Sequence, residues 1–194
     1  MGKRFAEIAF TPAVKKEQER YGSRRAYQRI EETGPPGDTL GPHEVAFIQA
    51  RDGFYISTIS ETGWPYIQFR VGPKGFLRVL DGRTLGFADL TGNTQYISAG
   101  NLKANDRIAL FLMDYPHKRR LKILGHAKIY DNGTEATDWI ARLRTDEKGG
   151  HPERAIVIGI EAFDWNCPQH ITPRFTVEEI NELKTKGHLD DEAL

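Results

Sequence analysis

The most informative stretch of the chain is Tyr66-Ile67-Gln68-Phe69-Arg70-Val71-Gly72-Pro73, which has the pattern of a β-strand followed by a turn. Side chains alternate between the two faces of a β-strand, so positions 66, 68 and 70 share one face and positions 67, 69 and 71 share the other. We therefore expect a strand whose apolar face packs on a core, while the opposite face presents the amide of Gln68 beside the guanidinium of Arg70. The glycines in the segment 72–75 that follows would let the backbone approach a ligand closely.

A second polar segment, Gly92-Asn93-Thr94-Gln95, follows a later strand and precedes an expected helix of about ten residues. Backbone N–H groups at a helix start attract anions. Ser98 and Asn101 share the helix face of Thr94. A fixed Arg70 near such a helix start predicts a phosphate site. The alternative for this segment is a capped surface helix beside a solvated strand face.

The rest of the chain indicates short strands joined by turns, with helices before and after them. Strands are expected over 54–60, 66–71, 76–80, 85–89, 107–114, 121–130 and 155–165, and further helices over 12–20, 23–32, 42–51, 134–144 and 176–187. This spacing predicts a mainly β fold of the α+β class, an antiparallel barrel with peripheral helices. We expect an N-terminal helical extension over 1–41, the barrel over 42–175, and a C-terminal helix and tail over 176–194.

Composition excludes several classes of protein. The net charge of the 194 residues is zero, so no global charge favours nucleic acid or a membrane surface. No apolar run approaches the roughly 20 residues that span a bilayer, and the N-terminus does not resemble a signal peptide. The one cysteine, Cys167, excludes an internal disulfide, and the six histidines show no metal-ligand spacing. These features predict a cytoplasmic protein without a metal.

Two more segments carry candidate binding groups. Arg120 and Lys122 share a face of the strand over 121–130, from which they could reach the same ligand as Arg70; the alternative is a solvated basic hairpin end. The loop over 165–175 contains two prolines, which make it rigid. Rigid polar loops often cover ligands, so His170 is a candidate general acid or hydrogen-bond donor. The alternative is a structural crossing into the last helix.

In this order and spacing, the motifs resemble the pyridoxamine 5′-phosphate oxidase-like family of FMN-binding split β-barrels, over roughly 42–175. The resemblance rests on Gln68-x-Arg70-x-Gly72-Pro73, on the segments 92–101 and 105–107, and on Arg120-Leu121-Lys122-Ile123-x-Gly125. The loop Cys167-Pro168-Gln169-His170-Ile171 is similar to that of an uncharacterised branch of the family, some members of which are joined to ferredoxin-type reductase modules.

The resemblance implies a homodimer with FMN at the subunit interface and an FMN-dependent oxidoreductase acting on an unknown small molecule. His170 is the implied catalytic group, and the implied cofactor-binding residues are Gln68, Phe69, Arg70, Val71, Asn93, Thr94, Gln95, Ser98, Asn101, Arg120, Lys122, Gln169 and Arg174. The phosphate-binding turn of the family is strongly basic, whereas Asn93 and Thr94 make it neutral here. The family's C-terminal Arg-x-His substrate clamp is also absent, so oxidation of pyridoxamine phosphate is not expected.

Two other functions stay open on the sequence. A non-catalytic flavin carrier or redox sensor would fit the lack of an obvious proton-transfer pair. A haem-binding protein of the same fold would use His170 or His126 as an iron ligand. For the oxidoreductase, the electron donor is expected to be a nicotinamide or a reductase partner.

Overall fold

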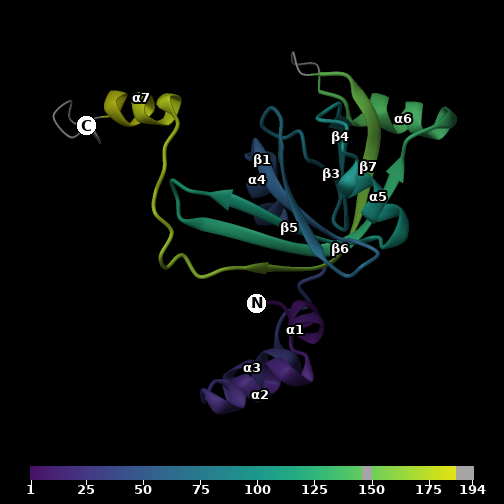
Figure 1. Cartoon of the computed structure of the whole chain (residues 1–194). Coiled ribbons are helices and arrows are strands. Elements are labelled where there is room, and N and C mark those ends of the chain that lie inside the picture. The colour runs from purple at the N-terminus through teal and green to yellow at the C-terminus, as the bar shows by residue number, and fades with distance from the viewer. Residues whose placement is uncertain (146–149, 187–194) are drawn as a thin grey trace.

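The structure is a computed structural model that describes residues 1–145 and 150–186. Within these residues, seven strands form one antiparallel sheet in the order β2-β1-β5-β6-β7-β4-β3. Their bounds are β1 Gly53–Ile59, β2 Pro65–Val71, β3 Arg78–Asp81, β4 Thr84–Leu90, β5 Arg107–Asp114, β6 Arg119–Tyr130 and β7 Pro152–Trp165. The sheet curls into a split β-barrel (Figure 1), which confirms the predicted mainly β fold class.

The helices lie around the sheet (Figure 1). Their bounds are α1 Lys3–Ala9, α2 Pro12–Arg20, α3 Arg24–Thr33, α4 Pro42–Gln49, α5 Ile97–Ala104, α6 Gly133–Leu143 and α7 Val177–Thr185. The sequence did not predict α1, which is only two turns long and buries Phe5 and Ala6. A capping box of Thr176 and Glu179 opens α7 at the predicted start of the last helix, and the predicted end at Gly187 lies outside the described residues.

Strand β2 is turned opposite to the expectation. Its apolar side chains face outward, with Ile67 65%, Phe69 53% and Val71 60% exposed. Gln68 and Arg70 are partly buried on the inner face. The physical reason is the position of the strand: β2 pairs only with β1 at the edge of the sheet, and its inner face lies over a polar cavity instead of the core.

An aromatic cluster joins the core to this cavity. The ring of Phe54 on β1 stacks on Phe76 at a centroid distance of 5.5 Å and meets Phe87 of β4 edge-on at 5.3 Å. All three side chains are buried. Such pairs are favourable beyond the apolar area that they bury. Because Phe76 and Phe87 also line the cavity, its apolar wall is continuous with the core.

The two ends of the chain extend from the barrel in different ways (Figure 1). The amino group of Met1 lies 3.3 Å from the carboxylate of Asp164, and Arg4 pairs with Glu161, so α1 is tied to β7. Helix α7 has no buried residue and follows an extended segment, residues 166–176, which we call the C-terminal arm. The division into 1–41, 42–175 and 176–194 stays a prediction.

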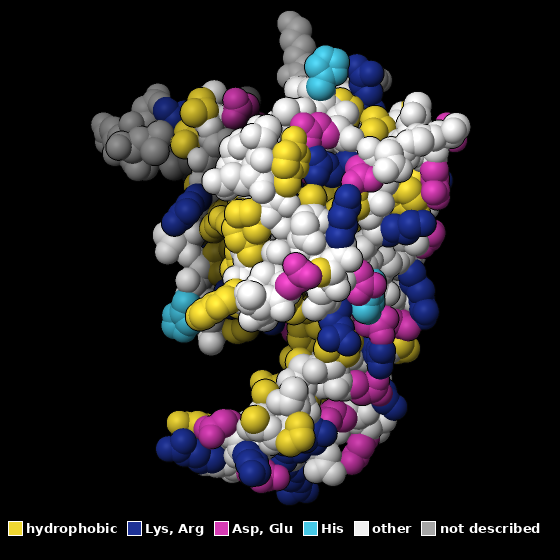
Figure 2. All heavy atoms as spheres, turned by 45° about the vertical axis from the view of Figure 1, so that its right-hand side comes forward, with side chains coloured by type: hydrophobic (Ala, Val, Ile, Leu, Met, Phe, Trp, Pro, Cys, Tyr) yellow, Lys and Arg dark blue, Asp and Glu magenta, His cyan; other side chains and the backbone are white. Residues whose placement is uncertain are grey.

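Acidic and basic side chains are interspersed over the face shown in Figure 2, including the N-terminal helices at the bottom of that view. This mixture agrees with the zero net charge of the chain. Within residues 1–145 and 150–186, none of the helices combines the length and apolarity that crossing a membrane requires.

Candidate functional site

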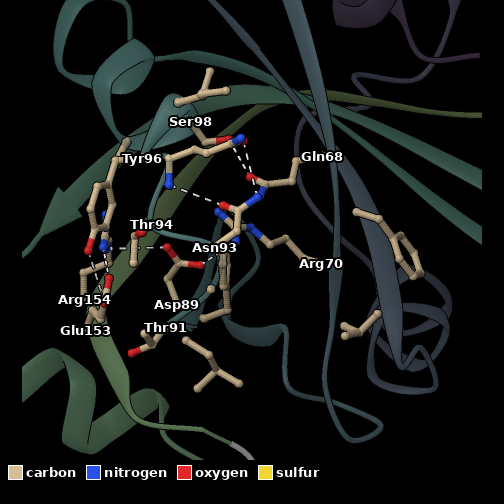
Figure 3. A pocket seen from close by; sticks show the side chains of 18 of the residues that line it. Gln68, Arg70, Asp89, Thr91, Asn93, Thr94, Tyr96, Ser98, Glu153 and Arg154 are labelled. Carbon is tan, nitrogen blue, oxygen red and sulfur yellow. Dashed lines mark hydrogen bonds and ion pairs between the residues drawn. The ribbon is translucent and has the colours of Figure 1, made fainter.

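A cavity of about 390 Å³ opens between β2, β4, α5 and the start of β7. Figure 3 shows polar and aromatic side chains from these separate elements pointing toward it. Its walls are formed by Tyr66, Gln68, Phe69, Arg70, Val71, Phe76, Phe87, Ala88, Asp89, Leu90, Thr91, Gly92, Asn93, Thr94, Gln95, Tyr96, Ile97, Ser98, Ala99, Glu153 and Arg154. The two polar segments singled out in the sequence therefore meet in space, although strands β3 and β4 separate them along the chain.

The inner face of β2 supplies the amide and the guanidinium of the cavity. Oε1 of Gln68 accepts a 2.8 Å hydrogen bond from the hydroxyl of Ser98 on α5. This bond spans the cavity wall between the edge strand and the helix (Figure 3), and it fixes the orientation of the Gln68 amide. Ser98 itself is buried, so its hydroxyl requires a partner.

The loop 91–96 enters the cavity as an irregular segment. The helix that was expected to start at Gly92-Asn93 begins at Ile97, so the prediction of a helix start at that point is wrong. Thr94 and Tyr96 have left-handed backbone conformations, with φ of 59° and 53°, which a continuing helix would not allow. The Oδ1 atom of Asn93 instead accepts a 3.3 Å hydrogen bond from the N–H of Gln95. The polar groups of this segment thus come from a turn.

Four charged side chains meet at the inner end of the cavity (Figure 3). Nη1 of Arg70 lies 3.0 Å from Oδ1 of Asp89, and Nε of Arg154 lies 3.6 Å from Oδ2 of the same carboxylate. Arg154 also pairs with Glu153, and its guanidinium carbon lies 4.9 Å from the ring centroid of Tyr96. The Arg70–Asp89 pair joins β2 to β4 across the gap that the sheet leaves open.

Burial is the largest influence on Asp89, and it raises the pKa of this carboxyl above the ordinary aspartate value. Arg70 and Arg154 lower the pKa, and Glu153 raises it, without reversing the effect of burial. The Nε atoms of both arginines are buried and form no hydrogen bond, although Nε of Arg154 is within ion-pair distance of Asp89.

Eight of the predicted cofactor-binding residues line this cavity: Gln68, Phe69, Arg70, Val71, Asn93, Thr94, Gln95 and Ser98. Asn101 does not line it. The side-chain amide of Asn101 donates a 3.0 Å hydrogen bond to the hydroxyl of Thr58, and both residues are buried. Asn101 thus fastens α5 to β1.

The predicted approach of Arg120 and Lys122 to the ligand of Arg70 does not hold within one chain. Strands β1 and β5 separate β6 from β2 in the sheet. Nη2 of Arg120 donates a 3.2 Å hydrogen bond to the backbone oxygen of Cys167, and Nζ of Lys122 lies 5.3 Å from the ring centroid of Phe5. Period two predicted the shared face of the two cations correctly, but it does not predict the order of the strands.

The C-terminal candidates also lie away from the cavity of their own chain. Gln169, His170 and Arg174 are exposed on the C-terminal arm and do not line the cavity. The guanidinium carbon of Arg174 lies 5.1 Å from the ring centroid of Tyr115, next to the β5–β6 hairpin. The roles of these three residues stay predictions.

Four further cavity residues were not predicted from the sequence: Asp89, Glu153, Arg154 and Tyr96. A signal for Asp89 and Arg154 was present: each is a charged residue at the end of an otherwise apolar strand segment. Their pairing depends on the register, in which Asp89 lies opposite Arg154 across β4 and β7. Among the described residues, no group of three or more His, Cys, Asp or Glu side chains is arranged to hold a metal ion.

Comparison with solved structures supports the fold. A provisionally assigned pyridoxamine 5′-phosphate oxidase from Lactobacillus delbrueckii superposes with a TM-score of 0.51 at 20% identity, covering 66% of this chain and 94% of that one. The HupZ protein of Group A Streptococcus gives a TM-score of 0.51 at 17% identity, covering 70% and 100%. At these identities, the likeness concerns the fold alone.

Sequence comparison identifies the family. No curated protein sequence matches the chain. The family model of pyridoxamine 5′-phosphate oxidase matches residues 40–166, which span the whole sheet and the cavity and make up more than half of the chain. The chain therefore belongs to the pyridoxamine 5′-phosphate oxidase family.

Proposed function

We propose that this chain binds FMN in the cavity between β2, β4 and α5, and that it is an FMN-dependent oxidoreductase acting on a small molecule. The observation that carries the proposal is the convergence of Arg70 and the polar loop 91–96 on one cavity in a barrel of this family. A guanidinium matches the geometry of a phosphate group. The volume of about 390 Å³ falls within the range of about 300–1,000 Å³ of small-molecule sites.

The chemistry of the cavity wall fits a phosphorylated flavin. Arg70 lies on the wall of the cavity, and a guanidinium is a strong hydrogen-bond donor to phosphate oxygens. Gln68 and Ser98 provide an amide and a hydroxyl for the polar edge of the ring or for the ribityl chain. Tyr96, which is half exposed on the cavity wall, provides aromatic surface for an apolar ring system. The site therefore offers a suitable group to each part of FMN.

Bound FMN would supply hydride or single-electron transfer. The protein's own residues bind and orient: Arg70 holds the phosphate, and Gln68 is kept at a fixed angle by Ser98. We propose that the electrons come from a nicotinamide or from a reductase partner. The substrate would lie over the exposed side of the cavity, where His170 of a second subunit would donate a hydrogen bond or a proton.

We propose a homodimer in which the C-terminal arm of one subunit covers the cavity of the other. Two observations support it. The arm residues Gln169, His170 and Arg174 are exposed and do not reach the cavity of their own chain. The outward face of β2 leaves Ile67 and Phe69 exposed beside the cavity, and apolar side chains gathered in this way mark interaction surfaces.

The first test is the absorption spectrum of the purified protein, before and after added FMN. We expect a bound flavin that is released on heating, and reduction of this flavin by NADH, NADPH or a reductase under anaerobic conditions. Arg70→Ala should weaken FMN binding about 10- to 100-fold, the range of a hydrogen-bonded charged contact. Arg78→Ala, a change of an exposed arginine on β3, is the matched control and should leave the affinity unchanged.

The outcomes separate the candidate functions. A protein that takes up no FMN, or an Arg70→Ala variant with full affinity, contradicts the proposed site. A protein that binds FMN but transfers no electrons to any acceptor would instead be a flavin carrier or redox sensor.

A further inference from the structure

The proposed phosphate site already contains a carboxylate. Asp89 lies between Arg70 and Arg154, with contacts of 3.0 Å and 3.6 Å to their guanidinium nitrogens (Figure 3). The side chain of Asp89 is only 8% exposed, and those of the two arginines are 19% and 10% exposed. An incoming phosphate that binds these arginines therefore approaches a buried anion.

The charges facing Asp89 come from two other strands. Arg70 belongs to β2, whereas Arg154 and Glu153 belong to β7. With Asp89 and Glu153 ionised, the two cations and two anions sum to zero. A phosphate monoester carries up to two negative charges, so its binding would leave this site with a large negative excess. Like charges at such distances in a partly buried site repel strongly.

The contacts of Asp89 keep its carboxylate at the site. It lies within β4, where it pairs in register with Arg154 of β7, and its side chain forms ion pairs with Arg70 and Arg154. Burial also removes most of the water that would screen the carboxylate. The remaining way to remove the charge is protonation, and burial favours it because the pKa of Asp89 is already raised above that of an ordinary aspartate.

We propose that Asp89 takes up one proton from solvent when a phosphate monoester binds to Arg70 and Arg154, so that this residue couples the affinity of the site to pH. The inference rests on the proposed function and adds a specificity-determining residue to it. The carboxylate becomes a neutral carboxylic acid, which can donate a hydrogen bond to a phosphate oxygen. Asp89 thereby favours ligands whose binding is strong enough to drive this protonation. The affinity of the site for a phosphate monoester should therefore fall as the pH rises.

Calorimetry of the wild-type protein tests the coupling directly. FMN is titrated at one pH into two buffers that differ in ionisation enthalpy, and the difference in heat gives the number of protons exchanged. Riboflavin, which lacks the phosphate, is the matched ligand. We expect the wild-type protein to take up more protons on binding FMN than the Asp89→Asn protein does. On binding riboflavin, the two proteins should take up the same number of protons. Equal proton exchange by the two proteins on binding FMN would overturn the proposal.

The FMN affinity of the Asp89→Asn variant is a second test. Asp89→Asn should bind FMN at least about tenfold more tightly than wild type at about pH 8, and this difference should shrink as the pH falls. Asp138→Asn removes an exposed carboxylate of α6 outside the cavity and should keep the proton uptake of wild type. An Asp89→Asn protein that folds normally and binds FMN no more tightly than wild type would contradict the inference. The same conclusion follows if Asp138→Asn abolishes the uptake.

A flavin-independent probe separates this inference from the proposed function. The Asp89 carboxyl carbon is titrated by NMR in wild-type protein, with inorganic phosphate or with chloride at matched ionic strength. Phosphate should move the titration midpoint upward. If FMN does not bind but phosphate shifts the midpoint, the flavin function fails and the coupling stands. An unchanged midpoint in phosphate overturns the coupling even if FMN binds.

Discussion

The side-chain amide of Asn101 donates a 3.0 Å hydrogen bond to the hydroxyl of Thr58, which joins helix α5 to strand β1 inside the protein. Both residues are buried, with 8% and 1% of their surface exposed. Ser98, one turn earlier on α5, reaches the cavity and orients Gln68. The position of the cavity wall therefore depends on a contact that is itself outside the cavity.

Replacing Asn101 with alanine should destabilise the fold by about 1–3 kcal/mol, because the change removes a buried hydrogen bond and leaves Thr58 without its donor. The free energy of unfolding in urea measures the effect. In a double-mutant cycle, Thr58→Val combined with Asn101→Ala should cost less than the sum of the single changes. Additive costs would show that the two side chains do not act as a pair.

Two glycines should respond in opposite ways to alanine. A Cβ on Gly125 of β6 would lie 2.4 Å from the backbone oxygen of Gly159, so Gly125→Ala should destabilise the protein by about 1–3 kcal/mol. A Cβ on Gly100 of α5 would meet nothing within 4 Å, and Gly100→Ala should stabilise it by about 0.5–1 kcal/mol through helix propensity. Thermal unfolding should show a lower melting temperature than wild type for Gly125→Ala and a higher one for Gly100→Ala. Equal shifts of the two melting temperatures would contradict this prediction.

The protein should lose stability in acid through Asp114. Burial raises the pKa of this carboxyl, but hydrogen bonds from His117 and the charge of Arg51 outweigh burial, so the net pKa lies below the ordinary value. The stabilisation is therefore present above the unfolded-state pKa of about 3.9 and is lost as the pH falls through the folded-state pKa. Asp114→Asn should lower the unfolding free energy at neutral pH and have a much smaller effect below about pH 3.

The contribution of Asp89 to stability should depend on pH in the opposite direction. Its pKa is raised by burial, so the folded state binds the proton more tightly than the unfolded chain does. Its contribution to stability is present below the unfolded-state pKa and is lost as the pH rises through the folded-state pKa. We expect the unfolding free energy of Asp89→Asn, measured in urea, to increase relative to that of wild type as the pH rises over this range. A relative decrease with rising pH would contradict the raised pKa.

The outward face of β2 should carry the proposed subunit contact. Ile67→Lys places a charge on a side chain that is 65% exposed in the single chain, so the fold should persist while association weakens. Sedimentation would then detect monomers at concentrations where the wild type is dimeric. Val14→Lys, on helix α2 with 38% exposure, is the control and should leave the dimer intact. A dimer that survives Ile67→Lys would place the interface elsewhere.

Local patterns in the sequence were enough to predict most of the strands. A continuous apolar run over 108–113, with a charged residue at each end, predicted β5 at its observed bounds. Period two predicted that Arg120 and Lys122 share a face of β6, and the residues between and beyond them form its buried face. The predicted start of the last helix at 176 agrees with α7, because its capping box is formed by residues only three positions apart. The motif order also identified the family, which the family model confirms.

Which face of β2 turns inward is known from the folded structure alone, because alternation defines two faces but not the environment of each. The order β2-β1-β5-β6-β7-β4-β3 then separates Arg120 and Lys122 from Arg70, and the register of β4 with β7 brings Asp89 to Arg154. These relationships depend on contacts between residues far apart in the chain. The physical reason is that strand pairing is set by packing of the whole sheet, which no local pattern encodes.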